Sequence, residues 1–202
     1  MQQFMKNLQY LQFDKLLSRL KITSEANNDL LILLVAKTGL RFSEALALTA
    51  ADFDFENNQL KITKAWNYKA ADGGFDETKN YSSNRTIVID QTTCELFRKI
   101  LGDTSSIDTE APIFVTQRVF NSTVNRRIEA LCIEADIPVV TLHGLRHTHA
   151  SVLISSGISI ASVSKRLGHS NISITQKVYM HLLDEQKKED DGKISKCLSL
   201  LG

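Results

Sequence analysis

An arginine follows a helix-ending glycine in the segment Thr38-Gly39-Leu40-Arg41, and Glu44 lies three residues further on. A glycine in this context is typical of a helix end, so we expect Arg41 at the start of the next helix. Glu44, on the same helix face, can hold the guanidinium group through a charge-assisted hydrogen bond. Taken alone, the pair is more simply interpreted as an ordinary surface ion pair, which contributes little.

A second group of chemically capable side chains lies between His143 and His149, where the sequence reads H-G-L-R-H-T-H. His143 and Arg146 are three residues apart, so a helix start presents both to one ligand, and helix N-termini attract phosphate. His143 and His147 also have the spacing of two zinc ligands. The zinc-protease pattern H-E-x-x-H needs a glutamate that is absent here, and the arginine cation opposes a dication. We therefore expect His147 and His149 to satisfy neighbouring backbone groups rather than to bind a metal.

Two weaker signals follow. Leu167-Gly168-His169 predicts a glycine-terminated helix followed by an exposed histidine, and Tyr179 comes ten residues after that histidine. A tyrosine in a helical segment is usually a half-buried core residue with its hydroxyl satisfied. Neither feature alone indicates a function.

The composition is that of a soluble globular protein, with 43% hydrophobic and 23% charged residues in a chain of 202. This length allows one domain with a substantial core, or one domain and a short arm. The net charge of +1 gives no direct support for nucleic-acid binding, which usually needs an excess of Lys and Arg. The charges are unevenly spread, because residues 121–170 carry five Lys or Arg against three acids, together with four of the five histidines.

Targeting and redox signals are sparse. The longest apolar run, residues 30–36, is too short to span a bilayer, and residues 1–10 do not resemble a secretory signal. The three cysteines, at 94, 132 and 197, are far apart and odd in number, which favours packing roles in a reducing compartment. We expect a cytoplasmic protein with no membrane association.

The hydrophobic pattern predicts a mainly helical α+β domain with one small antiparallel three-stranded sheet near its N-terminal side. The strands are expected at 52–55, 59–63 and 85–90, with 64–79 as a long connection. Residues 1–20 are expected to form a loosely helical arm or linker, 21–183 the main domain, and 184–202 a tail helix. The other helices are expected at 29–38, 42–48, 92–101, 122–135, 145–155, 160–167 and 172–181.

The order of the four segments carries more information than any one of them. An arginine, then His-x-x-Arg, then Gly-His, then a tyrosine about ten residues later resembles the catalytic signature of the tyrosine recombinases, the phage integrase family. The sequences around these residues, T-G-L-R-x-x-E-A-L, L-R-H-T-H-A-S and R-L-G-H-S, are also similar to those of the family. The resemblance runs from about Thr23 to Leu183 and is most specific between His143 and Tyr179. It implies that the fold is the catalytic fold of that family.

The family also carries a lysine in a β-hairpin turn between the first arginine and the His-x-x-Arg. The matching segment here places Lys79 just before the strand that Arg85 opens, as in integrases of phages and mobile elements. Lys64 and Lys69, on the long connection, are competitors. The residues around Lys79 resemble the family's segment, and this favours Lys79 over the other two lysines.

The resemblance implies site-specific DNA recombination, the integration or excision of a mobile element, through a 3′-phosphotyrosine intermediate and without metal, ATP or other cofactor. Tyr179 is then the nucleophile, and Arg41 and Arg146 span the non-bridging phosphate oxygens. His169 adds a hydrogen bond to the phosphate, and Lys79 protonates the leaving 5′-oxygen. His143 manages the proton of the tyrosine.

The expected partners are double-stranded DNA carrying attachment or recombination sites, further copies of the chain in a tetramer on that DNA, and accessory directionality or bending proteins. Three alternatives stay open: a type IB topoisomerase-like activity, a DNA-binding regulator without activity, and a metal hydrolase. Residues 4–20 are too short for the N-terminal domain that family members usually carry, so we expect a catalytic fragment of a longer integrase. The tail, with Ile194, Leu198 and Leu201, could dock on a neighbouring protomer or fold back on its own domain.

Overall fold

The structure is a computed structural model that describes residues 10–23, 27–70, 72–77, 83–102, 109–173 and 175–180, and the single residues 191 and 199. Further helical residues lie at 172–173 and 175–180. The helices and strands, in chain order, are α1 (Tyr10–Leu17), α2 (Asn28–Thr38), α3 (Phe42–Leu46), the short 3₁₀ helix η1 (Ala50–Asp52), β1 (Phe53–Asp54), β2 (Gln59–Ile62), β3 (Lys64–Trp66), β4 (Phe75–Glu77), β5 (Arg85–Val88), α4 (Gln91–Leu101), α5 (Asn121–Glu134), α6 (Leu142–Ser155) and α7 (Ile160–Leu167).

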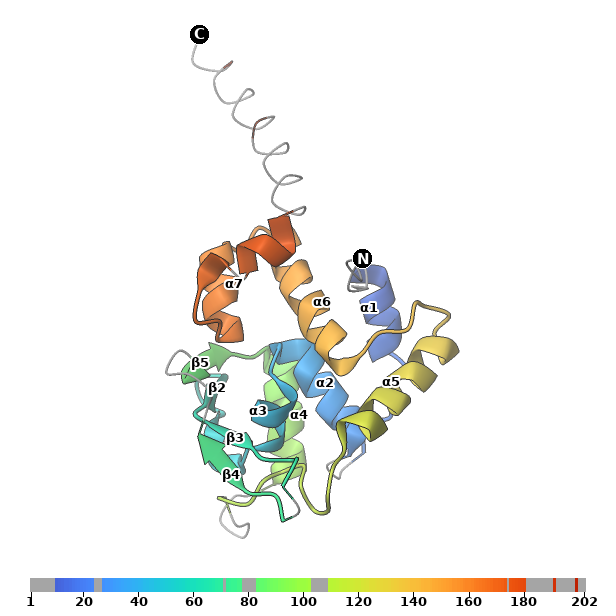
Figure 1. Cartoon of the computed structure of the whole chain (residues 1–202), viewed down its shortest axis with the longest axis vertical. Helices are drawn as coiled ribbons and strands as arrows, with labels where there is room; N and C mark the ends of the chain where they lie inside the picture. The colour runs from blue at the N-terminus through green and yellow to red at the C-terminus, as the bar shows by residue number, and fades with distance from the viewer. Residues whose placement is uncertain are drawn as a thin grey trace.

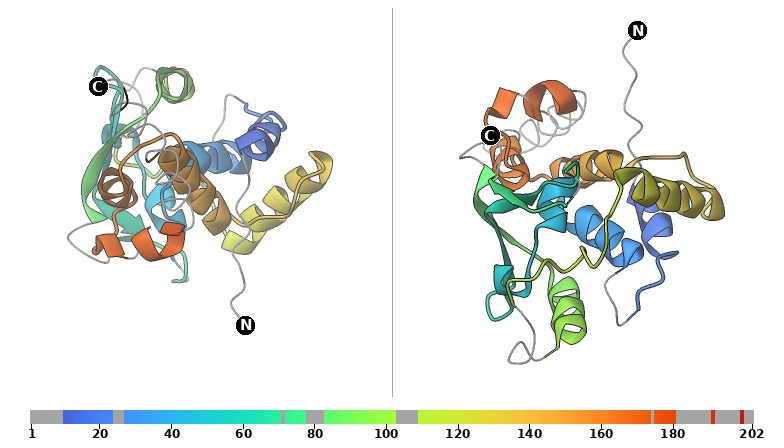
Figure 2. Two further views of the ribbon diagram at one scale, coloured as in Figure 1. Left: turned by 90° about the horizontal axis from the view of Figure 1, so that it is seen from above. Right: turned by 60° about the horizontal axis from the view of Figure 1, so that its bottom comes forward.

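Helix α2 is the centre of the molecule. Most of its residues are buried, and Figures 1 and 2 show the sheet on one side of it and α5 on the other. A helix that is apolar on nearly every face must be covered on every face. The start of α2 is capped by Asn27, whose side chain accepts a hydrogen bond from the backbone N–H of Leu30. Arg127 of α5 also forms a bidentate ion pair with Asp29 in the first turn, with N···O distances of 2.7 and 2.8 Å.

The predicted three-stranded antiparallel sheet is confirmed, in the order β1-β2-β5. Leu60 pairs with Phe53 on one side and with Ile87 on the other, so one face of the sheet contributes to the core. The mainly helical fold class is confirmed with it. Helix α7 contacts β5 and α6, so the end of α7, which leads into His169, lies close to the sheet.

The expectation that 64–79 is only a long connection is wrong. Strands β3 and β4 form a second, two-stranded antiparallel sheet within it. The hairpin is stabilised by Trp66 and Phe75, whose rings meet edge to face at 5.1 Å. Its strands have three residues each and show no alternation of buried and exposed side chains, so the period-2 signal is missing.

Helix α6 begins at Leu142, three residues before the expected start, because the Thr141 side chain caps it by accepting from the backbone of Gly144. The predicted boundary at residue 20 stays a prediction, although α1 places Phe13 and Leu16 in the main core.

None of the described helices is long and apolar enough to cross a membrane. Cys94 and Cys132 are buried and free, as their packing role predicts, and Cys197 lies outside the described residues.

Gly39 joins α2 to α3 where no other residue fits well. Its φ of +71° is unfavourable for L side chains, and an added Cβ would lie 2.7 Å from Cδ2 of His149. Gly157 has a φ of +85° but open space around the same position. We expect Gly157→Ala to lower the free energy of unfolding by about 1 kcal/mol from backbone strain alone. Gly39→Ala should cost about 1–3 kcal/mol more through overpacking. Urea denaturation of the two variants measures the difference, and equal losses would contradict the close contact.

Candidate active site

Arg41 stands at the junction of α2 and α3, as its sequence context predicts. It is the residue before the first turn of α3, and its side chain is one-third exposed. The guanidinium group donates to Oε1 of Glu44 at 2.6 Å and to the backbone carbonyl of Gly168 at 2.8 Å. The prediction that Glu44 holds Arg41 is therefore confirmed. The contact with Gly168 joins residues 127 positions apart, so the local sequence around Arg41 does not predict it.

Glu44 is buried between two arginines, not paired with one. Arg85, the first residue of β5, donates to both carboxylate oxygens of Glu44, at 2.9 and 3.2 Å. Burial alone would raise the pKa of Glu44, but the hydrogen bonds and charge of Arg85, with the charge of Arg41, hold it below its usual value. Glu44 is therefore an anion at neutral pH and fixes both guanidinium groups.

Arg146 lies in the first half of α6 and is buried, with 3% of its surface exposed. It donates to the backbone carbonyl of Gly39, at the end of α2, and to that of Leu167, at the end of α7, at 2.7 Å. Burial first, and the charge of Arg41 second, lower its pKa. The carbonyl ends of two helices offset this cost, because they carry partial negative charge.

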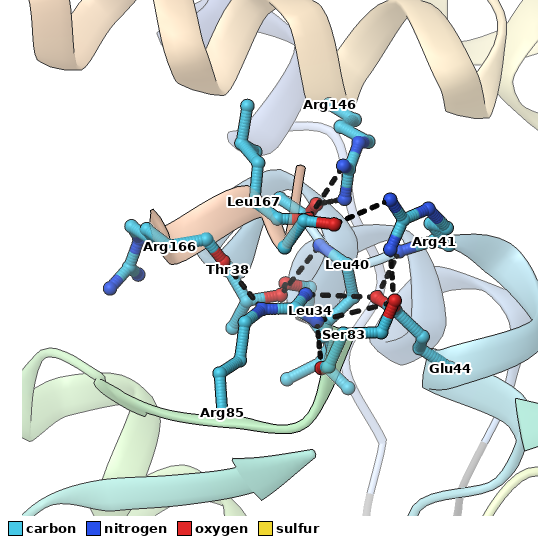
Figure 3. Close-up of polar contacts among 12 residues, drawn as sticks. Leu34, Thr38, Leu40, Arg41, Glu44, Ser83, Arg85, Arg146, Arg166 and Leu167 are labelled. Atoms are coloured by element: carbon cyan, nitrogen blue, oxygen red, sulfur yellow. Dashed lines mark hydrogen bonds and ion pairs between the residues drawn. The ribbon is translucent and has the colours of Figure 1, made fainter. Parts of the chain in front are cut away.

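The end of α7 is held by three arginines from three different elements (Figure 3). Arg85 donates to the carbonyl of Arg166 at 2.6 Å, Arg146 to that of Leu167, and Arg41 to that of Gly168. These last carbonyls have no partner within the helix. Each therefore receives a charged donor, and the backbone that leads directly into His169 is fixed.

His169 follows this clamped helix end. Its Nδ1 lies 2.8 Å from Oγ1 of Thr175, in the helical segment that also contains Tyr179. Burial, then the charges of Arg146 and Arg41, lower the pKa of His169 to about 4. The imidazole is neutral near pH 7 and can donate from the nitrogen that Thr175 does not engage.

Four of the predicted site residues line one pocket of about 360 Å³. They come from different parts of the chain: Arg41 from the start of α3, His143 and Arg146 from α6, and His169 from the segment after α7. This volume lies at the lower end of the range that is typical of pockets for small ligands. The remaining lining residues are Leu40, Phe42, Ser43, Glu44, Ala65, Tyr68, Asn121 and Leu142.

Tyr179 does not line this pocket. Its side chain is among the largest fully buried ones, with 1% exposed, and burial raises its pKa well above the usual range. Its hydroxyl oxygen lies 2.7 Å from Nδ1 of His147. Nε2 of that imidazole lies 3.1 Å from Nε2 of His143, which does line the pocket.

The expectation that His147 and His149 satisfy backbone groups is half right. Nδ1 of His149 lies 3.0 Å from the carbonyl of Ala36, as expected, and Nε2 accepts from Arg166. His147 instead contacts two side chains, those of Tyr179 and His143. The i, i+4 spacing of the histidines reflects this contact, and the described residues hold no group of three or more His, Cys, Asp or Glu that could bind a metal.

Lys79 lies outside the described residues, as do Ile194, Leu198 and Leu201 of the tail. Of the two competing lysines, Lys64 is engaged elsewhere: its ammonium group lies 3.1 Å from a carboxylate oxygen of Asp52 and 3.1 Å from Oγ1 of Thr49. Neither Lys64 nor Lys69 lines the pocket.

The sequence interpretation missed Arg85 and the contact made by His147. A signal for Arg85 was present in the sequence. Residue 85 lies on the same face of the predicted strand as the apolar residues 87 and 89, and a charged residue on a buried face needs a buried partner. The partner of His147 depends on tertiary contacts, and no local pattern reveals it.

Comparison with known proteins identifies the family. The model of the phage integrase family matches residues 6–186. The chain is 30% identical over 177 residues to the integrase of Staphylococcus phage L54a, covering 81% of this chain and 50% of that protein. It is also 30% identical over 185 residues to the tyrosine recombinase XerA of Saccharolobus solfataricus, covering 91% and 55%. The chain thus spans about half the length of the curated relatives it matches.

The fold is likewise similar to solved recombinase structures. One is the Tn1549 transposon integrase in complex with circular intermediate DNA, with a TM-score of 0.71, 23% identity, and coverage of 86% of this chain and 62% of that one. Another is the XerA recombinase, with a TM-score of 0.70, 22% identity, and coverage of 92% and 65%. The family match extends over most of the sequence, and the folds agree. The chain therefore belongs to the phage integrase family.

Proposed function

We propose that this chain is the catalytic part of a site-specific tyrosine recombinase that integrates or excises a mobile element. The observation that carries the proposal is the single pocket lined by Arg41, His143, Arg146 and His169. Tyr179 is linked to that pocket through His147. Two guanidinium groups and two imidazoles around one hollow suit a phosphodiester, whose transition state concentrates negative charge on oxygen.

The two arginines retain donors for a phosphate. Each guanidinium group has five N–H donors. Arg41 uses one N–H on Glu44 and one on Gly168, and Arg146 uses one on Gly39 and one on Leu167. The remaining donors can bind the non-bridging oxygens without breaking the contacts that fix the side chains.

In the proposed reaction, Oη of Tyr179 attacks phosphorus, a 3′-phosphotyrosine bond forms, and the bond to the 5′-oxygen breaks. Lys79 supplies the proton to that oxygen, His169 hydrogen-bonds the phosphate, and His143 manages the tyrosine proton. The 5′-hydroxyl of a partner strand reverses the step. Because the phosphodiester energy is kept in the covalent bond, no ATP is required.

The partners remain part of the proposal. They are double-stranded DNA carrying the recombination sites, other copies of the chain in a tetramer, and accessory directionality or bending proteins. Residues 21–183 form the catalytic domain in this scheme, with 1–20 leading into it and 184–202 as a tail. The cytoplasmic location stays a prediction.

Nicked suicide DNA duplexes of candidate attachment sites test the proposal. We expect the purified chain to form a denaturation-resistant protein–DNA adduct at the same rate with and without excess EDTA, because Arg41 and Arg146 carry the charge stabilisation. Cleavage that releases free DNA ends and stops on chelation would favour a metal hydrolase. Recombination of paired sites, measured against relaxation of supercoiled DNA, separates a recombinase from a type IB topoisomerase.

A further inference from the structure

His147 joins the buried Tyr179 hydroxyl to the pocket. Its Nδ1 lies 2.7 Å from Oη of Tyr179, and its Nε2 lies 3.1 Å from Nε2 of His143. The two histidines are one turn apart on α6, and their rings meet edge to face with centroids 4.6 Å apart. The helix backbone therefore holds the two imidazoles in register, and Tyr179 completes a line of three titratable side chains.

The surroundings of His147 keep it neutral. Burial is the largest cause of its lowered pKa. The titratable groups that face it from its own helix and from the α7 side, His143, Arg146 and His169, lower it further, to about 4. A neutral imidazole has one N–H and one lone pair, so it accepts on one side and donates on the other. When Tyr179 donates to Nδ1, the Nε2–H of His147 must donate to Nε2 of His143.

Tyr179 needs such a route because water has little access to it. Its side chain is 1% exposed, and burial opposes formation of the phenolate. A hydroxide ion from solvent would have to enter this buried region to remove the proton. A neutral acceptor already in contact with the hydroxyl avoids that step.

We propose that His147 is a proton-transfer residue of this site, taking the Tyr179 proton at Nδ1 while passing its own Nε2 proton to His143; the proposal rests on the recombinase function above. The O–H bond of Tyr179 breaks as the Nδ1–H bond of His147 forms, and the Nε2–H bond of His147 breaks as that of His143 forms. The electron pair left on Oη forms the bond to phosphorus, and the bond to the 5′-oxygen breaks. The positive charge ends on His143, inside the pocket where the anionic phosphate is bound, and rejoining returns the proton.

The variant His147→Asn tests the transfer step, because the amide oxygen replaces Nδ1 as an acceptor for Tyr179 but cannot take a proton. We expect adduct formation on nicked DNA duplexes to fall by about 100-fold at pH 7. The loss should shrink as the pH rises from 7 to 9.5, because hydroxide then removes the proton, while the wild-type rate changes little. His147→Gln, whose amide reaches toward His143 instead, should behave in the same way.

His149→Asn is the matched control, since His149 is equally buried on the same helix but contacts Ala36 and Arg166. Any loss in that variant should be the same at every pH, and thermal unfolding reports whether each variant is folded. A pH-independent loss in both His147 variants, or wild-type rates in them, overturns the proton-transfer role alone. If the wild-type chain forms no adduct that depends on Tyr179, the recombinase function and this inference fail together.

Discussion

Tyr179→Phe is expected to reduce covalent adduct formation by more than about 10⁴-fold, because removal of the proposed nucleophile leaves only the binding contributions of the site. DNA affinity should be unchanged, since the Tyr179 side chain is buried and does not line the pocket. The fold should also persist, because phenylalanine fills the same space and only the hydrogen bond to His147 is lost. Adduct yield on nicked duplexes, with a mobility-shift measurement of affinity, checks both expectations.

Tyr10→Phe is the matched control. Tyr10 lies on α1 and is 68% exposed, so the same chemical change there should leave adduct yield, affinity and stability as in the wild type. Persistence of a denaturation-resistant adduct in Tyr179→Phe would refute the nucleophile assignment. Because the Tyr179 side chain is buried and does not line the pocket, its substitution should affect the chemical step more than DNA binding.

The parts of the site that the sequence predicts are those fixed by local geometry. The pair of Arg41 and Glu44 follows from a three-residue spacing at a helix start, and the end of α7 follows from Gly168. The order of the site segments identifies the family without any knowledge of packing. These features depend on a few neighbouring residues, which the sequence lists directly.

The remaining parts depend on contacts between distant segments. Arg85 reaches Glu44 across 41 positions, and His147 reaches Tyr179 across 32, so no spacing rule relates the members of either pair. The burial of Tyr179 has the same origin, because it follows from how its helical segment packs against α6 and α7. The sequence identifies the chemical groups, but packing decides which groups meet and which one does not line the pocket.

Glu44→Gln is expected to lower the free energy of unfolding by about 3–5 kcal/mol, because it leaves the buried guanidinium group of Arg85 without its anion. Both side chains of this pair are only 3% exposed, so solvent cannot replace the lost charge. Glu56→Gln is the control: its ion pair with Arg98 is longer, at 3.6 Å, and its side chain is 90% exposed. That change should cost no more than about 0.5 kcal/mol. Equal urea midpoints for the two variants would mean that the buried ion pair of Glu44 and Arg85 does not stabilise the fold.

The pH dependence of stability gives a second, independent test of Glu44. Its pKa in the folded protein lies below the ordinary glutamate value of about 4.5, so the folded state binds its proton less readily than the unfolded state does. The stabilisation is therefore complete above about pH 4.5 and declines as the pH falls toward the folded pKa. Glutamine cannot titrate, so the difference in stability between wild type and Glu44→Gln should be largest near neutral pH and should narrow on acidification. A constant difference down to pH 3 would mean that the carboxylate charge is not what holds Arg41 and Arg85 in place, and that Glu44 acts only through its shape.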